Sequence, residues 1–487
     1  MLSDFLTNNK VGVIKTKDYY PQSFPYNPSA RYPEYVFSTL SSEKNFVYEA
    51  IRNLLFSLGL DKKNFNSKHW NPLGEFIIPG NKVLLKPNLV HERKKNVDST
   101  CLTTHPSLIR AIIDYVAIAL KGKGEIIIGD APIPDTDFEK VKRENNLDKL
   151  VDFYRKNNIE IQIIDFRKEK TWKPYYLAAV LKREKLLGDV LGFIPINLGK
   201  ESELLDFKKD YRKFRVTKWS KKEMLKHHND KKNEYLIANT FLQADTVINI
   251  PKLKTHRKAG MTGALKNMIG INGSKDWLPH HRAGAKEEGG DEYLKKDWRK
   301  KVRTLLMEKQ NASSNKIFIV FLSFLRFLLS LIKYVFPYQD SYLEGSWWGN
   351  DTVARTIVDI NKIAFYANKK GAFKETPQRK IFTIVDAIVA GEKEGPLEPS
   401  PKHCGLIIGG VNSVAIDIVC SKIMGFDFRK IPTLGYALQS KKYKLFEGDL
   451  EKIDITFGQK NIDIKELEKN IALKFTPAAG WKGHIES

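Results

Sequence analysis

Residues 244–270 read A-D-T-V-I-N-I-P-K-L-K-T-H-R-K-A-G-M-T-G-A-L-K-N-M-I-G, and this stretch is the most informative part of the sequence. Its apolar run at 247–250 predicts a buried strand that ends at Pro251. Gly260 and Gly263 stand among the titratable residues that follow. Open α/β proteins place ligands at the carboxyl ends of their strands, and glycines permit close approach of the backbone. The stretch therefore predicts a functional site, with a solvated basic loop as the alternative.

Strands and helices alternate along the rest of the chain. Apolar runs predict strands at 82–90, 124–129, 159–165, 245–250 and 381–386. Helical periodicity is present at 43–58, 104–120, 138–156, 351–366 and 413–424. This alternation is typical of a parallel sheet covered by helices. We therefore expect an α/β fold of two lobes, with mostly parallel sheets and an inserted amphipathic helix of membrane type.

Changes in composition divide the chain into five segments. We expect an N-terminal α/β lobe at 1–204, a basic insertion at 205–234, and a continuation of the sheet with the candidate site at 235–292. A basic and amphipathic membrane-associating segment follows at 293–346, and a C-terminal α/β lobe at 347–487.

The chain is strongly basic. Its 81 Lys and Arg residues exceed its 57 Asp and Glu residues and give a net charge of +24 over 487 residues. Such a charge favours nucleic acid, anionic lipid or phosphorylated substrates as partners. Because helix-turn-helix, zinc-finger and aromatic RNA-binding signatures are absent from the sequence, nucleic acid is the least expected of these.

The cysteines and the first residues bear on the compartment. Cys101, Cys404 and Cys420 are far apart and form no C-x-x-C motif, so we expect no iron–sulfur cluster and no zinc ribbon. Few cysteines in a long chain fit a reducing compartment. Residues 1–16 lack the pattern of a signal peptide, so the sequence predicts a cytoplasmic protein.

Residues 317–336, I-F-I-V-F-L-S-F-L-R-F-L-L-S-L-I-K-Y-V-F, have the length of a membrane span. Their polar residues Ser323, Arg326, Ser330 and Lys333 would form one narrow stripe on a helix, opposite a wide apolar face. This pattern predicts a helix that lies in the surface of an anionic membrane, here its inner face. A core or oligomer-interface helix and a true membrane span are the alternatives.

His256, Lys266 and Asp130 are the candidate catalytic residues. Histidine titrates nearest to neutral pH and suits proton transfer, so His256 is the expected base. Lys266 is expected to anchor an anion, act as an amine nucleophile or bear a cofactor. Asp130 ends a strand, where open sheets place ligands. A structural hydrogen bond is the alternative for each residue.

Further polar residues are candidates for binding. We expect a phosphate or carboxylate site that is helped by the amide groups of a helix N-terminus near Met261. Its expected residues are Lys86, Asn88, Lys252, Lys254 and Asn267. His280 and His281 are candidate ligands of a divalent metal. One of the two rings is expected to point into the site, and both are kept as candidates.

Six ordered motifs resemble those of the domain-of-unknown-function family 362. Besides I-N-I-P-K-L-K-T-H with T-G-A-L-K-N-M-I-G, they are K-P-N-L-V at 86–90, T-H-P at 104–106, G-D-A-P at 129–132, V-D-A-I-V-A-G-E-K-E-G-P at 385–396 and V-A-I-D at 414–417. The resemblance covers most of residues 82–440 and implies a fold more than a reaction. Many relatives append ferredoxin-like cysteine motifs, which this chain lacks.

The order of His256, G-M-T-G, Lys266 and then His280 or His281 is also similar to the nickel-dependent lactate racemase family. That resemblance implies a pincer cofactor bound covalently to Lys266, nickel on the later histidine and His256 as a base. The racemase's second catalytic histidine should follow a strand, where this sequence has Asp130.

The sequence thus predicts a membrane-associated cytoplasmic enzyme. It would act on an anionic small molecule, such as a sugar phosphate, or on a lipid-linked substrate, by racemase-like or epimerase-like proton transfer at carbon. A divalent metal such as nickel, or a lysine-linked cofactor, would assist. One alternative is a non-catalytic scaffold recruited to an anionic membrane. Another is an oxidoreductase that receives electrons from a separate iron–sulfur partner.

Overall fold

A mixed central sheet organises the molecule. The computed structural model describes residues 4–487 except 94–96, 173–178, 217–219, 339 and 472. The strands, in their order across the sheet, are β17 (Lys460–Ile462), β16 (Ile455–Phe457), β1 (Val11–Lys15), β15 (Glu398–Gly410), β14 (Lys380–Glu394), β10 (Thr246–Ile250), β2 (Lys82–Pro87), β3 (Glu125–Asp130) and β4 (Ile161–Asp165). Two further strands lie outside this order: β11 (Lys252–His256) pairs with β14, and β12 (Gly260–Thr262) pairs with β11.

The centre of this sheet is parallel. β14, β10, β2, β3 and β4 run in one direction, whereas β15 pairs antiparallel with both β14 and β1. The carboxyl ends of β10, β2 and β3 therefore meet at one edge. The protein is thus of the expected mixed α/β class, with a mainly parallel central sheet.

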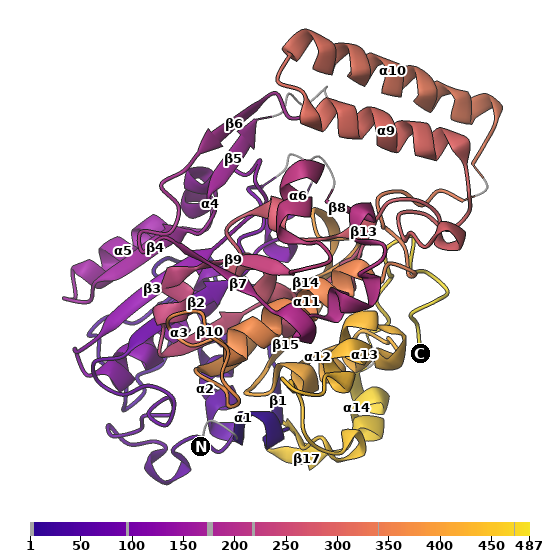
Figure 1. The fold of residues 1–487 in the computed structure, drawn as a ribbon. Coiled ribbons are helices and arrows are strands. Elements are labelled where there is room, and N and C mark those ends of the chain that lie inside the picture. Colours follow the sequence, from indigo (N-terminus) through magenta and orange to yellow (C-terminus); the bar gives the residue numbers. More distant parts are fainter. Residues whose placement is uncertain (1–3, 94–96, 173–178, 217–219, 339, 472) are drawn as a thin grey trace.

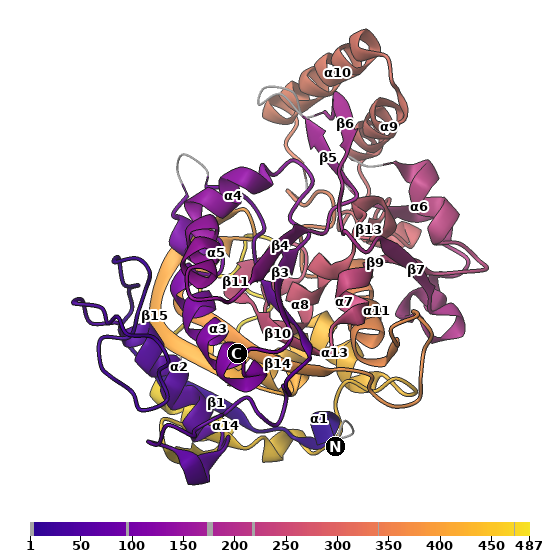
Figure 2. The same cartoon turned by 90° about the vertical axis from the view of Figure 1, so that its left-hand side faces the viewer.

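Alternating side chains bury both faces of the sheet. Val83 and Leu85 of β2 face a core with α2 (Phe46–Ser57) and α3 (Pro106–Leu120), whereas Leu84 faces a core with α11 (Thr352–Tyr366) and α12 (Ser413–Ile423). Strands buried on both faces read as continuous apolar runs, which is why the sequence revealed them. Figure 2 shows α3 and α11 on opposite sides of the sheet.

Smaller elements complete the layers. The short helices are α1 (Asp4–Thr7), α4 (Phe138–Glu144), α5 (Leu147–Arg155), α6 (Lys221–His227), α7 (Asn239–Gln243), α8 (Ala264–Asn267), α13 (Pro432–Gln439) and α14 (Ile464–Ile471). The two-stranded sheets are β5 (Glu169–Trp172) with β6 (Lys182–Lys185), β7 (Phe193–Asn197) with β9 (Glu234–Ala238), and β8 (Phe214–Arg215) with β13 (His281–Arg282).

The structure does not show the two separate lobes that we expected. β1 from the N-terminal segment pairs with β15 and β16 from the C-terminal segment, and β14 pairs with β10. Strands from both expected lobes therefore share one sheet. The division of the chain into five segments stays a prediction.

Two helices form a hairpin that projects from one end of the molecule. These are α9 (Trp298–Ala312) and α10 (Lys316–Val335), which lie side by side at the end farthest from the N-terminus (Figures 1 and 2). The predicted helix at 317–336 therefore forms. The side chain of Lys333, which we assigned to its polar stripe, lies outside the described residues. Within the described part of the chain, no helix is both long enough and apolar enough to cross a membrane.

Candidate functional site

A cavity of about 260 Å³ lies at the sheet edge where β2, β3 and β10 end. Segments that follow these strands supply most of its wall, together with α8. Seven of the residues predicted from the sequence line it: Asn88, Asp130, Lys254, His256, Lys266, Asn267 and His280. Lys86, Lys252 and His281 are not part of the wall. Residues 244–270 thus contribute several of their polar side chains, among them Lys254, His256 and Lys266, to one cavity.

Asp130, a residue of the cavity wall, forms a buried ion pair with Lys86, which lies outside the wall. The Lys86 ammonium lies 2.7 Å from Asp130 Oδ1, and the backbone N–H of Leu89 donates to Oδ2 at 2.7 Å. A Cβ at Gly270 would overlap Asp130 Oδ1, so only glycine permits this approach. Both carboxylate oxygens are engaged. Asp130 therefore positions groups around it and is poorly placed to act as a base.

Amide side chains fix the floor of the cavity. Asn88 Nδ2 donates to Asn267 Oδ1 at 3.1 Å, and Asn267 Nδ2 donates to Asn249 Oδ1 at 2.8 Å. The Lys254 ammonium donates to Asn88 Oδ1 at 3.2 Å and to the carbonyl of Leu102 at 2.6 Å. Three strand ends are thereby tied together, which presets the position of these groups.

Lys252 is a structural residue, contrary to our expectation of a substrate contact. Its ammonium lies 2.6 Å from Asp386, and both side chains are fully buried. The Lys252 ammonium also donates to the hydroxyl of Tyr20 at 2.7 Å, and Tyr20 donates to Asp386 at 2.6 Å. Regular alternation would put Lys252 and Lys254 on one face of β11, but the register of β11 against β14 shifts between them. Lys254 therefore reaches the cavity while Lys252 faces this closed cluster.

The hydrogen bonds of His256 assign it a donor role. Its Nδ1 accepts the backbone N–H groups of Lys258 at 3.0 Å and Ala259 at 3.1 Å. Burial and the nearby Lys266 ammonium hold the pKa of His256 well below its usual value, so the ring is neutral. The proton of a neutral ring with Nδ1 as acceptor sits on Nε2. His256 thus presents an N–H to a ligand, not the lone pair expected of a base.

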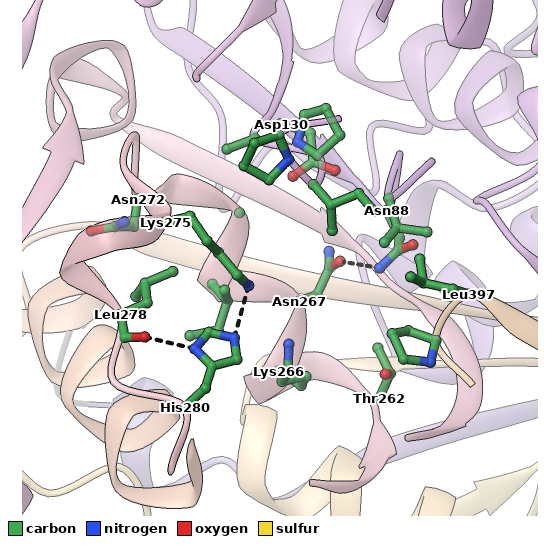
Figure 3. Close-up of a pocket in the computed structure, with 18 of the residues that line it drawn as sticks. Asn88, Asp130, Thr262, Lys266, Asn267, Asn272, Lys275, Leu278, His280 and Leu397 are labelled. Atoms are coloured by element: carbon green, nitrogen blue, oxygen red, sulfur yellow. Dashed lines mark hydrogen bonds between the residues drawn. The ribbon is translucent and has the colours of Figure 1, made fainter. Parts of the chain in front are cut away.

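His280 has the opposite arrangement. Its Nδ1 lies 2.6 Å from the carbonyl of Leu278 and must donate, so Nε2 carries the lone pair and accepts the Lys275 amine at 2.7 Å (Figure 3). Burial and Lys275 hold the pKa of His280 well below its usual value. Figure 3 places this pair on one side of the cavity and Asn88 and Asn267 on the other. His280 is therefore the imidazole with a basic nitrogen directed at the cavity.

The donor set does not fit a metal ion held by protein side chains. His281 is buried outside the cavity wall, and neither of its ring nitrogens has a hydrogen-bond partner among the described residues. His256 presents a proton, and Asp130 is taken by Lys86. No group of three or more His, Cys, Asp or Glu side chains in the described part of the chain is arranged for a metal. We therefore derive no step through nickel.

The cavity wall is rich in lysines whose charged form is disfavoured by burial. Burial lowers the pKa of Lys254 to about 7 and those of Lys258 and Lys266 to about 8, and it holds the pKa of Lys275 well below its usual value. Three carboxylates of the cavity wall form ion pairs with cations that lie outside the wall: Asp130 with Lys86, Glu169 with Arg183 and Glu344 with Arg303. An anion in the cavity would favour the charged forms of these lysines.

Lys266 belongs to α8, whose first N–H groups are capped by a carboxylate of α12. The carboxylate of Asp417 accepts the N–H groups of Ala264 at 2.6 Å and Leu265 at 3.0 Å, and Gly263 leaves space for it. The Lys266 amine has no hydrogen-bond or ion-pair partner in the described part of the chain, and it lines the cavity. It is thus available to an anion or for covalent attachment.

Lys275 and Glu344 are among the lining residues that sequence reasoning missed. Lys275 precedes His280 by five residues, so their spacing was the available signal. Glu344 follows the α9–α10 hairpin and reaches the cavity only through the fold.

Comparison with known proteins gives the family. The domain of unknown function DUF362 matches residues 83–200 and 197–422. The chain belongs to this family. A search of curated proteins found no significant match. A crystal structure of a Thermotoga maritima protein, a structural genomics target, is similar at 14% identity and a TM-score of 0.31; the match covers 77% of this chain and 58% of that one. The relationship to lactate racemases is not shown.

Proposed function

We propose that this DUF362 chain is an enzyme that binds a substrate with at least two negative charges and transfers a proton at carbon, as a racemase or epimerase does. The observation that supports this most directly is the basic Nε2 of His280 within a chamber of lysines. A phosphate or carboxylate group would occupy the position between Lys254, Lys266 and Lys275.

The two histidines take complementary roles in this proposal. The incoming anion favours the charged form of Lys275, draws this side chain from His280 and so releases Nε2. His280 then removes the proton from a carbon next to a carbonyl group: the C–H bond breaks, the proton goes to Nε2, and the electron pair moves to the carbonyl oxygen. His256 donates its N–H to the resulting enolate oxygen, and the lysines stabilise its charge. Delivery of a proton to the opposite face of the same carbon completes an epimerisation. Delivery to the neighbouring carbon, with the hydroxyl proton passing to the former carbonyl oxygen, completes an isomerisation.

Burial of His280 suits this role once the substrate is bound. Its pKa in the free protein is low because burial and Lys275 disfavour the charged ring. A substrate anion nearby favours the charged ring and raises that pKa toward neutral pH, where a general base is most effective. The sequence had assigned the base to His256, and the proposal reverses this assignment.

Deuterium exchange tests the reaction. The full chain is incubated in D₂O with dihydroxyacetone phosphate and with phosphorylated 2-hydroxy acids, and loss of the C–H signal is followed by NMR. We expect exchange with the wild type and at least a hundredfold slower exchange with His280→Asn, which keeps the donor to Leu278 but lacks Nε2. His69→Asn, at an exposed histidine, is the matched control.

The same experiment separates the alternatives. Binding of sulfate without exchange of any compound would contradict the enzyme and favour a non-catalytic binding protein. Exchange that survives in His280→Asn but not in His256→Gln would return the base to His256. Intact mass of protein from its native host tests the further expectation of a cofactor on Lys266, since an adduct adds mass to the chain.

A further inference from the structure

One face of α10 is apolar and uncovered. Its exposed large side chains are Ile317, Phe318, Val320, Phe321, Phe324, Phe327, Leu328, Leu331 and Tyr334. At 100° per residue all but Phe318 fall within one continuous arc of the helix, and Phe324, near the middle, is 54% exposed. A folded monomer rarely leaves so large an apolar surface in water. Something outside the described part of this chain therefore covers it.

The opposite face of α10 is already occupied by α9. Gln310 of α9 donates to the Ser323 hydroxyl at 2.5 Å and accepts the Arg326 guanidinium at 2.6 Å. Ile319 and Leu322 are buried on the same side. Ser323 and Arg326 of the predicted polar stripe thus contact α9, and the apolar face points away from this contact. Figures 1 and 2 both place α10 at the extremity of the molecule.

The hairpin also carries exposed cations. Trp298, Lys301, Leu305 and Lys309 are exposed on α9 at spacings of three or four residues, which puts them on one stripe. Lys316 is exposed where α10 begins. Lysines beside tryptophan and phenylalanine are typical of helices in the surface of an anionic membrane, whereas interfaces between proteins are depleted of lysine.

We propose that the α9–α10 hairpin docks on the surface of an anionic membrane, with the exposed face of α10 among the acyl chains and the lysines of α9 at the headgroups. The charge of the hairpin selects the occupant: a bilayer supplies both an apolar layer and negative headgroups, whereas a second copy would bring these lysines against its own. This proposal is independent of the chemistry proposed for the cavity.

Vesicle flotation with the full chain tests the proposal. We expect the protein to float with vesicles of phosphatidylcholine and phosphatidylglycerol at low salt, and at least tenfold less with phosphatidylcholine alone or at 0.5 M salt. The variant F321Q/F324Q/F327Q should lose at least tenfold in binding, because its apolar face is interrupted while its helix propensity is kept. The charge variant K301E/K309E should lose binding to the anionic vesicles.

A matched control guards against general effects of removing apolar surface. Leu187, Val190 and Leu191 are also exposed, but lie outside the hairpin, and L187Q/V190Q/L191Q should float like the wild type. Equal melting temperatures of all variants show that they fold. Failure of the wild type to float with anionic vesicles at low salt would overturn the proposal. It would equally be overturned if light scattering showed a dimer that F321Q/F324Q/F327Q dissociates and that does not float.

Discussion

Anion binding in the cavity should take up protons, and Lys254→Met should remove about one of them. Lys254 has a pKa of about 7, and Lys258 and Lys266 have pKa values of about 8. At pH 8 the first amine is about one-tenth protonated and each of the others about half protonated. A dianion bound among the cavity lysines that holds these three amines in the charged form therefore draws about two protons to them at pH 8, and about one in Lys254→Met; Lys275 adds the same further uptake to both proteins.

The pH dependence of the affinity for an anion follows from the same three lysines. The anion binds the protonated lysines, so affinity is highest below pH 7 and falls as the pH rises through 7 and 8. One amine of pKa about 7 costs about 1.4 kcal/mol to protonate at pH 8, which is about tenfold in the dissociation constant. Removing the Lys254 charge should weaken binding at pH 7 by about tenfold.

Calorimetry with sulfate measures the uptake, because sulfate remains a dianion over this range. Titrations at pH 8 in Tris and in EPPS buffers give the number of protons from the difference in heat between the buffers. Lys68→Met, at an exposed lysine, is the control and should bind like the wild type. Zero uptake with measurable sulfate binding would refute the reasoning, since it would mean that the cavity lysines are charged before the anion arrives.

Three further predictions concern stability. The free protein should become more stable from pH 7 to 9 in urea titrations, because the unfolded chain binds protons that Lys254 and Lys266 do not; a decrease would contradict their lowered pKa values. Gly270→Ala should cost about 3 kcal/mol in urea unfolding, since the methyl group would push Asp130 from its ion pair; an unchanged midpoint would contradict this packing. Asp417→Ala should cost about 3 kcal/mol and weaken sulfate binding, because two N–H groups of α8 lose their acceptor; unchanged binding would show that this cap does not position Lys266.

Much of the fold was predictable because its signals are local. Strands β2, β3 and β10 are buried on both faces, so each is a continuous apolar run that the sequence displays directly. The pairing of β1 with β15 was not predictable in the same way. Val11 lies opposite Gly410, and nothing in either short segment specifies a partner so far along the chain. Two expected lobes therefore proved to share one sheet.

The positions of the site residues were more predictable than the tautomers of the two histidines. Strand ends and glycines indicated where His256, Lys266 and Asp130 would gather. The tautomers depend on single backbone groups: two N–H groups meet Nδ1 of His256, and one carbonyl meets Nδ1 of His280. No residue type encodes these contacts, because every residue except proline has both groups. This is why the base predicted from the sequence, His256, differs from the base that we propose, His280.

The hairpin and the cavity share one charged group, Glu344. This residue lines the cavity and accepts the Arg303 guanidinium of α9 at 2.6 Å. Arg303 and Lys258 hold the pKa of Glu344 well below its usual value, so the carboxylate is charged at any pH at which the protein works. It offsets part of the positive charge of Arg303 and part of that of Lys258. A shift of α9 relative to the cavity would change the distances from Glu344 to Arg303 and to Lys258. The electrostatic potential that an anion meets in the cavity would change with them. The position of the hairpin on a membrane and the affinity of the cavity are therefore expected to be linked through this ion pair.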